Sequence, residues 1–131
     1  HMQGSPSTMQ INPKYKNVLL DIYDFFETQI KKFKYKNTII DPGIGFGKNH
    51  QHNIALMRAI PRFKASGYDL LWGISRKSVI GQLTGKSTAK DRLAGTLGSS
   101  IFAALNGVDI LRVHDVDEHN DMLNVYQALD G

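Results

Sequence analysis

The stretch Asp69–Ser78, DLLWGISRKS, indicates the fold of this chain. Its first half is a short apolar run, which is typical of strands that are buried on both faces of a parallel sheet. Its second half places two cations and two hydroxyls directly after that run. The pattern therefore predicts a β-strand whose carboxyl end carries polar chemistry, followed by a short helix from Ser78 to Leu83.

Two similar apolar runs flank this one, at 38–40 (TII) and 109–113 (DILRV). Amphipathic spacing predicts helices between and around them, over 13–33, 53–65, 91–106 and 117–129, with Pro61 kinking or shortening the second. Residues 1–12 are rich in Gly, Ser, Pro and Thr and are predicted to form a loop.

Alternating strands and helices indicate parallel βα units, and right-handed connections leave either an open doubly wound sheet or a (β/α)₈ barrel. Polar residues follow all three strands, whereas an open sheet usually gathers its site at one switch point. We therefore predict an α/β chain that forms part of a (β/α)₈ TIM barrel. A complete barrel takes about 250 residues, so 131 residues supply roughly half of one.

Composition limits the functional classes. Cysteine is absent, which excludes disulfides and thiolate metal sites and is compatible with a reducing compartment. The sequence contains no apolar run of membrane-spanning length, and a net charge of +4 favours anionic substrates. The basic stretch Lys31–Lys36 could form an RNA-binding patch, but lysines at the polar end of a helix explain it better, so no nucleic acid partner is predicted.

The segment Asp41–Lys48, DPGIGFGK, is a glycine-rich turn after a strand. It lacks the Walker A spacing, because Lys48 is followed by Asn49 instead of Ser or Thr, and its third glycine is misplaced for a dinucleotide fingerprint. A plain βα turn is one interpretation. The other is a ligand site in which a carboxylate accepts two parallel N–H donors and the glycines let the backbone approach a flat ligand.

The other strand ends carry cations. Arg76 is predicted to form a structural salt bridge, whereas Lys77 is predicted to lie near a ligand. Arg112 and His114 are two residues apart on a strand and so point to the same side. Because an unpaired buried arginine is costly, we expect an anionic ligand there, with an internal acidic partner for Arg112, or a core position for His114, as the alternatives.

The remaining histidines suggest no metal site. His50, His52 and His119 are predicted to be surface or loop residues.

Taken together, five stretches resemble the dihydropteroate synthase family: 1–10, 41–48, 75–78, 92–96 and 112–116. The resemblance covers essentially the whole chain and implies the C-terminal half of the family's TIM barrel, about strands 6 to 8, with residues 1–12 following an absent fifth strand. The family's reaction joins 4-aminobenzoate to 6-hydroxymethyl-7,8-dihydropterin diphosphate, giving 7,8-dihydropteroate and pyrophosphate in folate biosynthesis.

The resemblance also implies a role for each residue. Asp41 would bind the pterin edge, with Gly45 beside the ligand. Lys77 would contact the pterin ring near the reacting atoms. Ser78 would bind the aminobenzoate carboxylate, with Phe46 at the side of that pocket. Arg112 and His114 would hold the pyrophosphate, so that Lys77, Arg112 and His114 are the predicted catalytic residues.

Further expectations follow from the same resemblance. The enzyme would use Mg²⁺ as cofactor, with no metal ligand in this part of the barrel. It would be cytoplasmic, would form a homodimer through helices of this half, and would be a target of sulfonamides. Because the part of the family barrel before these strands is absent, we expect weak or no turnover from this chain alone. Two alternatives are a related pterin-binding methyltransferase barrel and a non-catalytic truncated half-barrel.

Overall fold

The computed structural model describes residues 1–33 and 37–130, so Lys34, Tyr35 and Lys36 of the basic stretch lie outside the described residues. The loop predicted over 1–12 is confirmed, and the bends and turns continue to residue 17. None of the helices within the described ranges combines the length and the apolar character that crossing a membrane requires.

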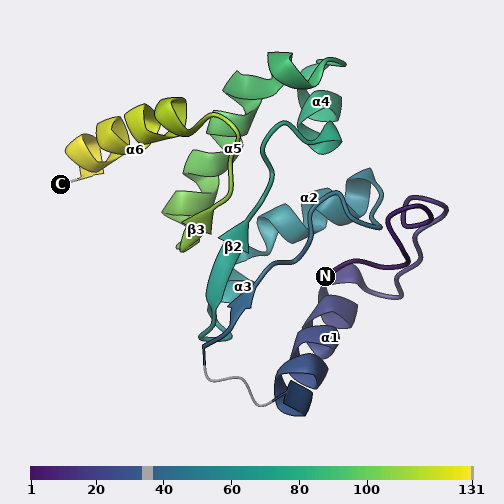
Figure 1. Ribbon diagram of the computed structural model, residues 1–131. Helices are drawn as coiled ribbons and strands as arrows, with labels where there is room; N and C mark the ends of the chain where they lie inside the picture. The colour runs from purple at the N-terminus through teal and green to yellow at the C-terminus, as the bar shows by residue number, and fades with distance from the viewer. Residues whose placement is uncertain (34–36, 131) are drawn as a thin grey trace.

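A parallel three-stranded sheet lies at the centre, in the order β1 (Ile39–Ile40), β2 (Asp69–Trp72) and β3 (Ile110–Leu111). In the register, Ile40 is opposite Leu70 and Trp72 is opposite Leu111. Because the strands are parallel, the loops that follow them leave the same edge of the sheet (Figure 1). The α/β class and the predicted strand positions are confirmed, although each strand is shorter than predicted.

The helices are α1 (Val18–Phe33), α2 (His50–Arg58), α3 (Ile60–Lys64), α4 (Ser78–Thr84), α5 (Leu93–Leu105) and α6 (Val116–Asp130), with a 3₁₀ turn η1 at Ala89–Arg92 before α5. The predicted start of α1 at Pro13 is wrong. The Oδ1 atom of Asn17 accepts the N–H groups of Leu19 and Leu20 at 3.1 and 3.2 Å, so the helix begins only after this cap.

The helix predicted over 53–65 is two helices. The first begins early, because Asn49 and His52 form a capping box in which the Asn49 side chain accepts the His52 N–H at 2.8 Å. It ends at Arg58 with Ala59 as its C-cap, and Pro61 lies in the first turn of α3, where a missing N–H costs nothing. The prediction that Pro61 kinks or shortens the helix is therefore confirmed, while the predicted helix start at residue 53 is wrong.

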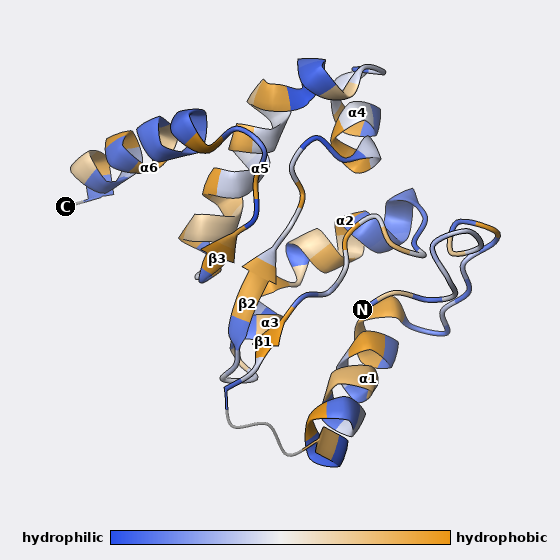
Figure 2. Cartoon of the chain, in the orientation of Figure 1, coloured by the Kyte–Doolittle hydropathy of each residue, from blue (hydrophilic) through white to orange (hydrophobic). Residues whose placement is uncertain are grey.

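The core lies between one face of the sheet and the helices. Ile40, Leu70 and Trp72 point into it and are almost completely buried, and the strands are mainly apolar in Figure 2. The prediction that the strand at 38–40 is buried on both faces is wrong, because Ile39 is 53 % exposed. Described residues cover only the helix side of β1, and Ile39 points to the other side.

The buried positions of the long helix α5 are small residues, Thr96, Ser100 and Ala103. Leu97 and Ile101 of α5 face α6. An apolar groove of about 680 Å³ runs between the two helices and is lined by Leu97, Gly98, Ile101, Glu118, Asp121, Met122, Val125, Tyr126 and Leu129.

Candidate active site

The loops after β1, β2 and β3 bring three polar segments together at one edge of the sheet. The first is the glycine turn that begins at Asp41. An Asp41 carboxylate oxygen accepts the Gly43 N–H at 2.8 Å, and the Gly45 N–H donates to the Asn53 side chain of α2 at 2.8 Å. Gly45 has φ +80°, a backbone conformation that favours glycine, and a Cβ there would lie 3.2 Å from the Lys77 side chain.

Lys48 closes this turn from the inside. Only 3 % of the residue is exposed, and its Nζ donates to the carbonyls of Gly43 at 2.9 Å and Phe46 at 2.8 Å. Burial lowers the pKa of Lys48 to about 8; the Asp41 carboxylate opposes this shift and the Lys77 ammonium adds to it. In the sequence Lys48 belonged only to a failed phosphate-loop pattern, and this structural role was missed.

Lys77 extends from the second loop toward the first. Its Nζ donates to the Ile44 carbonyl and lies 4.3 Å from the centroid of the Phe46 ring, a cation–π geometry. Burial lowers the pKa of Lys77 to about 8, although Asp41 raises it and Arg112 lowers it further. Lys77 is therefore half-buried within the cluster.

Arg112, from the end of β3, pairs with Asp41 through an Nη2–Oδ2 distance of 3.3 Å. A Cβ on Gly73 would lie 2.5 Å from Arg112 Nη2, so glycine leaves room for the guanidinium. The premise that Arg112 is buried is wrong, because its side chain is 57 % exposed on the uncovered face of the sheet. The acidic partner is the alternative that the structure shows, and such an exposed pair contributes little stability.

His114 is held by the second loop. The buried Ser75 Oγ accepts the His114 backbone N–H at 3.2 Å and lies 2.9 Å from His114 Nδ1. His114 itself is exposed, which excludes the core position considered for it. Ser75 was noted in the sequence only as part of a polar segment, because a buried serine has no pattern that distinguishes it from a surface one.

The predicted salt bridge of Arg76 is confirmed. Its Nε donates to Asp115 Oδ2 at 3.0 Å, and Nη2 contacts the other carboxylate oxygen. The backbone of Arg76 has φ +58°, an unusual conformation for a residue with a side chain. The Thr96 hydroxyl accepts its N–H at 3.1 Å and Arg92 Nη1 donates to its carbonyl at 2.8 Å, which together maintain that conformation.

A cavity of about 240 Å³ opens between the second and third loops, lined by Gly73, Ser75, Lys77, Arg112, Val113 and His114. The cavity has two cationic groups and an imidazole in its wall and no carboxylate among the described residues that line it. This arrangement suits an anion with several acceptor oxygens, and the guanidinium offers planar N–H donors to such a ligand.

The predicted site residues therefore fall into two groups. Asp41 pairs with Arg112, Lys77 lies over the Phe46 ring beside Gly45, and Lys77, Arg112 and His114 line the same cavity. Ser78 is the exposed first residue of α4 and does not line that cavity. Its role stays a prediction.

The prediction that His119 is a surface residue is wrong. His119 is 3 % exposed, with Nδ1 lying 2.6 Å from the Asp115 carbonyl and Nε2 3.0 Å from Ser100 Oγ. It faces inward because it sits on the side of α6 that packs on α5. His50 is exposed, and its Nδ1 lies 2.7 Å from the Gln82 side chain.

The donor set around the cavity does not fit Mg²⁺, which needs oxygen ligands. Lys77, Arg112 and His114 offer none, and the nearby Asp41 already pairs with Arg112. Across residues 1–33 and 37–130, no cluster of three or more histidine or acidic side chains is arranged to hold a metal ion.

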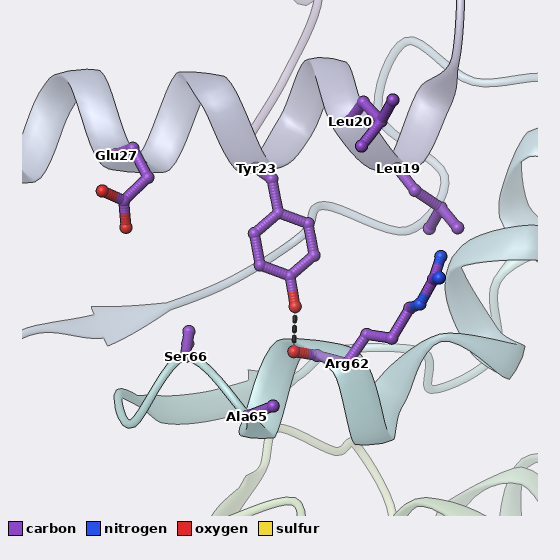
Figure 3. Close-up of a pocket in the computed structure, with 7 residues that line it drawn as sticks. All are labelled: Leu19, Leu20, Tyr23, Glu27, Arg62, Ala65 and Ser66. Atoms are coloured by element: carbon purple, nitrogen blue, oxygen red, sulfur yellow. Dashed lines mark hydrogen bonds between the residues drawn. The ribbon is translucent and has the colours of Figure 1, made fainter.

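A second hollow, of about 400 Å³, lies between α1 and α3. Figure 3 shows the Tyr23 hydroxyl donating to the Arg62 carbonyl across it. None of the predicted site residues is among its lining residues, which are Leu19, Leu20, Tyr23, Glu27, Arg62, Ala65 and Ser66. The strand-end cavity is therefore the candidate site.

This combination of parallel strands with a carboxylate, a glycine turn and cations at one edge agrees with the comparison with known proteins. The sequence pattern described as "Pterin binding enzyme" matches residues 1–114, so the chain belongs to the pterin-binding enzyme family. Within that family, the relatives it resembles are dihydropteroate synthases. The Neisseria meningitidis serogroup B enzyme is 44 % identical over 137 residues, covering 98 % of this chain and 48 % of the relative.

Solved structures give the same result. Dihydropteroate synthase from Thermus thermophilus in complex with 4-aminobenzoate superimposes with a TM-score of 0.94 at 38 % identity, covering 100 % of this chain and 55 % of that one. The same enzyme in complex with 6HMPPP gives a TM-score of 0.95 at 38 % identity, with 100 % and 54 % covered. The chain thus spans about half the length of these relatives, and its fold is confirmed as part of a TIM barrel.

Proposed function

We propose that this chain supplies part of the active site of a dihydropteroate synthase, which condenses 4-aminobenzoate with 6-hydroxymethyl-7,8-dihydropterin diphosphate. One observation supports this most strongly. Asp41, Lys77, Arg112 and His114 come from three different strand ends and converge at one edge of the sheet. In (β/α)₈ enzymes that edge is where catalytic residues gather.

In this proposal the pterin lies against the glycine turn. The Asp41 carboxylate accepts two parallel N–H groups from the 2-amino group and the adjacent ring nitrogen, a geometry that its present weak pair with Arg112 leaves accessible. Gly45 permits close approach of a flat ring. Lys77 is near enough to both Asp41 and Arg112 for their charges to shift its pKa, which suits a position where ring and diphosphate meet.

The diphosphate occupies the cavity beside Arg112 and His114. The 4-aminobenzoate nitrogen attacks the pterin methylene carbon, the bond from that carbon to the diphosphate oxygen breaks, and the nitrogen loses a proton. Negative charge grows on the departing pyrophosphate, so donors already placed around it stabilise the transition state more than the ground state. Phe46 and Ser78 are proposed to bind the aminobenzoate, the position that a sulfonamide would occupy.

Mg²⁺ remains part of the proposal, but we assign no step to it. Its ligands would be oxygens of the diphosphate, because the cavity wall offers cations. A cytoplasmic location is likewise proposed, on a sequence without cysteine.

The test is pyrophosphate binding by the chain itself, followed as a rise in melting temperature. We expect pyrophosphate to raise the melting temperature of the wild type and of Arg58→Ala, a matched loss of an exposed arginine on α2, but not of Arg112→Ala. Equal shifts in all three proteins would show a general ionic effect and would contradict the proposal. A methyltransferase barrel has no use for a pyrophosphate site at Arg112 and His114, so pyrophosphate should not raise its melting temperature.

Turnover is measured separately. Three strands leave the other face of the sheet uncovered, so we propose that the 131-residue chain alone has weak or no activity. Release of pyrophosphate at the rate of a full-length relative would overturn this proposal. Aggregates in light scattering without pyrophosphate binding would favour a non-catalytic half-barrel.

A homodimer through the α5–α6 groove is also proposed. Val125 is 60 % exposed and Leu129 83 %, and an apolar face of this kind is stabilised when a second copy covers it. Val125→Asp should shift the mass in light scattering from dimer to monomer. Leu20→Asp, at a comparably exposed leucine on α1, should leave the mass unchanged.

A further inference from the structure

We infer that Ser75 is a positioning residue that fixes the tautomer of His114, so that Nδ1 accepts a hydrogen bond and Nε2–H is presented to the cavity. The tautomer itself depends only on contacts within this chain. Its consequence for the leaving pyrophosphate rests on the proposed function.

Ser75 has a hydrogen bond to donate inside the protein. The hydroxyl oxygen already accepts the His114 backbone N–H at 3.2 Å, and the residue is 6 % exposed. Its hydrogen therefore needs an internal acceptor, because a buried donor without a partner is costly. Among the described residues the acceptor within reach is His114 Nδ1, 2.9 Å away.

The ring of His114 can accept that hydrogen bond in only one neutral form. A neutral imidazole carries one hydrogen, and a nitrogen that accepts from a hydroxyl cannot also hold it. With Nδ1 accepting from Ser75, the hydrogen is on Nε2, the nitrogen turned away from Ser75. Because His114 lines the cavity beside Lys77 and Arg112, a ligand there meets a third donor. The other tautomer would present a lone pair to an anion and repel it.

His119 provides an internal comparison with the opposite outcome. Its Nδ1 lies 2.6 Å from the Asp115 carbonyl, which can only accept, so Nδ1 carries the hydrogen. Its Nε2 then accepts from the Ser100 hydroxyl at 3.0 Å. Two serine–histidine pairs in one chain therefore hold opposite tautomers, because the second partner of each pair differs.

The test is the pair of ring ¹⁵N chemical shifts in the ¹⁵N-labelled chain at about pH 8, where an ordinary histidine is neutral. The chain has five histidines, and the signals of His114 are identified by their loss in His114→Gln. We expect a protonated Nε2 and an unprotonated Nδ1 for His114, and the reverse for His119. A His114 ring with its hydrogen on Nδ1, or an equal mixture in the wild type, would overturn the inference.

Ser75→Ala tests the cause. The His114 shifts should move toward a mixture of tautomers while those of His119 stay unchanged, and pyrophosphate affinity should fall about 3- to 10-fold because the donor is no longer preorganised. Ser99→Ala is the control, since it removes a buried hydroxyl that has no hydrogen-bond partner among the described residues. Unchanged His114 shifts in a folded Ser75→Ala would refute the role of Ser75. If the variant does not fold, the wild-type spectrum still decides the tautomer.

The proposed function can fail separately. A wild-type chain with the expected His114 tautomer that does not bind pyrophosphate would support the tautomer and contradict the leaving-group site.

Discussion

Replacing Lys48 by methionine removes the ammonium that closes the glycine turn while keeping a side chain of similar length. Two short charge-assisted hydrogen bonds are lost, at 2.8 and 2.9 Å, each contributing about 1.5 kcal/mol, together with longer contacts to the carbonyl and ring of His1. Removal of the buried charge offsets that loss, but the Gly43 and Phe46 carbonyls are left without a donor, so the expected net destabilisation is about 2 kcal/mol. Urea unfolding followed by the fluorescence of Trp72, the single tryptophan and 1 % exposed, measures it.

Lys90→Met is the matched control, because Lys90 is exposed in η1 and should change the free energy of unfolding by less than about 0.5 kcal/mol. The pH dependence is a second check. The pKa of Lys48 is lowered to about 8 on folding, so between about pH 8 and 10 the unfolded chain binds more protons and stability rises with pH. This contribution disappears in Lys48→Met. Equal stability of the two methionine variants would refute the reasoning.

Three further outcomes are expected. Gly73→Ala places a Cβ 2.5 Å from Arg112 Nη2 and should weaken pyrophosphate binding in calorimetry, with little change in melting temperature because the exposed guanidinium can move. Hydrogen bonding to Arg76 lowers the pKa of Asp115. The stability that this carboxylate contributes should therefore be lost as the pH falls below about 4. In urea titrations Asp115→Asn should not show this loss of stability at acid pH. Because the pKa of Lys77 is about 8, pyrophosphate affinity should fall as the pH rises through 8. The affinity of Lys77→Met should lack this fall. The same dependence of affinity on pH in both proteins would exclude Lys77 from the site.

The element order could be predicted because short apolar runs alternate with amphipathic segments. The helix starts could not, because they depend on individual side chains. Asn17 and Asn49 accept backbone N–H groups at the starts of α1 and α2, and the spacing of the apolar residues does not indicate either cap. Gly107, just after α5, has a φ of +85°, a conformation that glycine adopts readily and that ends the helix.

The gathering of several candidate residues at one edge of the sheet could be predicted, but their contacts could not. Position after a strand was enough to place Asp41, Lys77 and Arg112 at one edge of the sheet. The prediction that Arg112 is buried failed because the alternation of side chains along a strand shows to which side of the sheet a residue points, but not whether anything covers that side. Lys48 was missed because its partners are backbone carbonyls, which every residue has.

The two links between the second and third loops have a geometric consequence. Adjacent residues on one loop, Ser75 and Arg76, bind His114 and Asp115 on the other. Two consecutive residues of one loop therefore contact two consecutive residues of the other, and these two links fix the spacing between the loops. Sequence change here can exchange side chains, but adding or deleting one residue in either loop would break both links together and turn the imidazole away from the cavity.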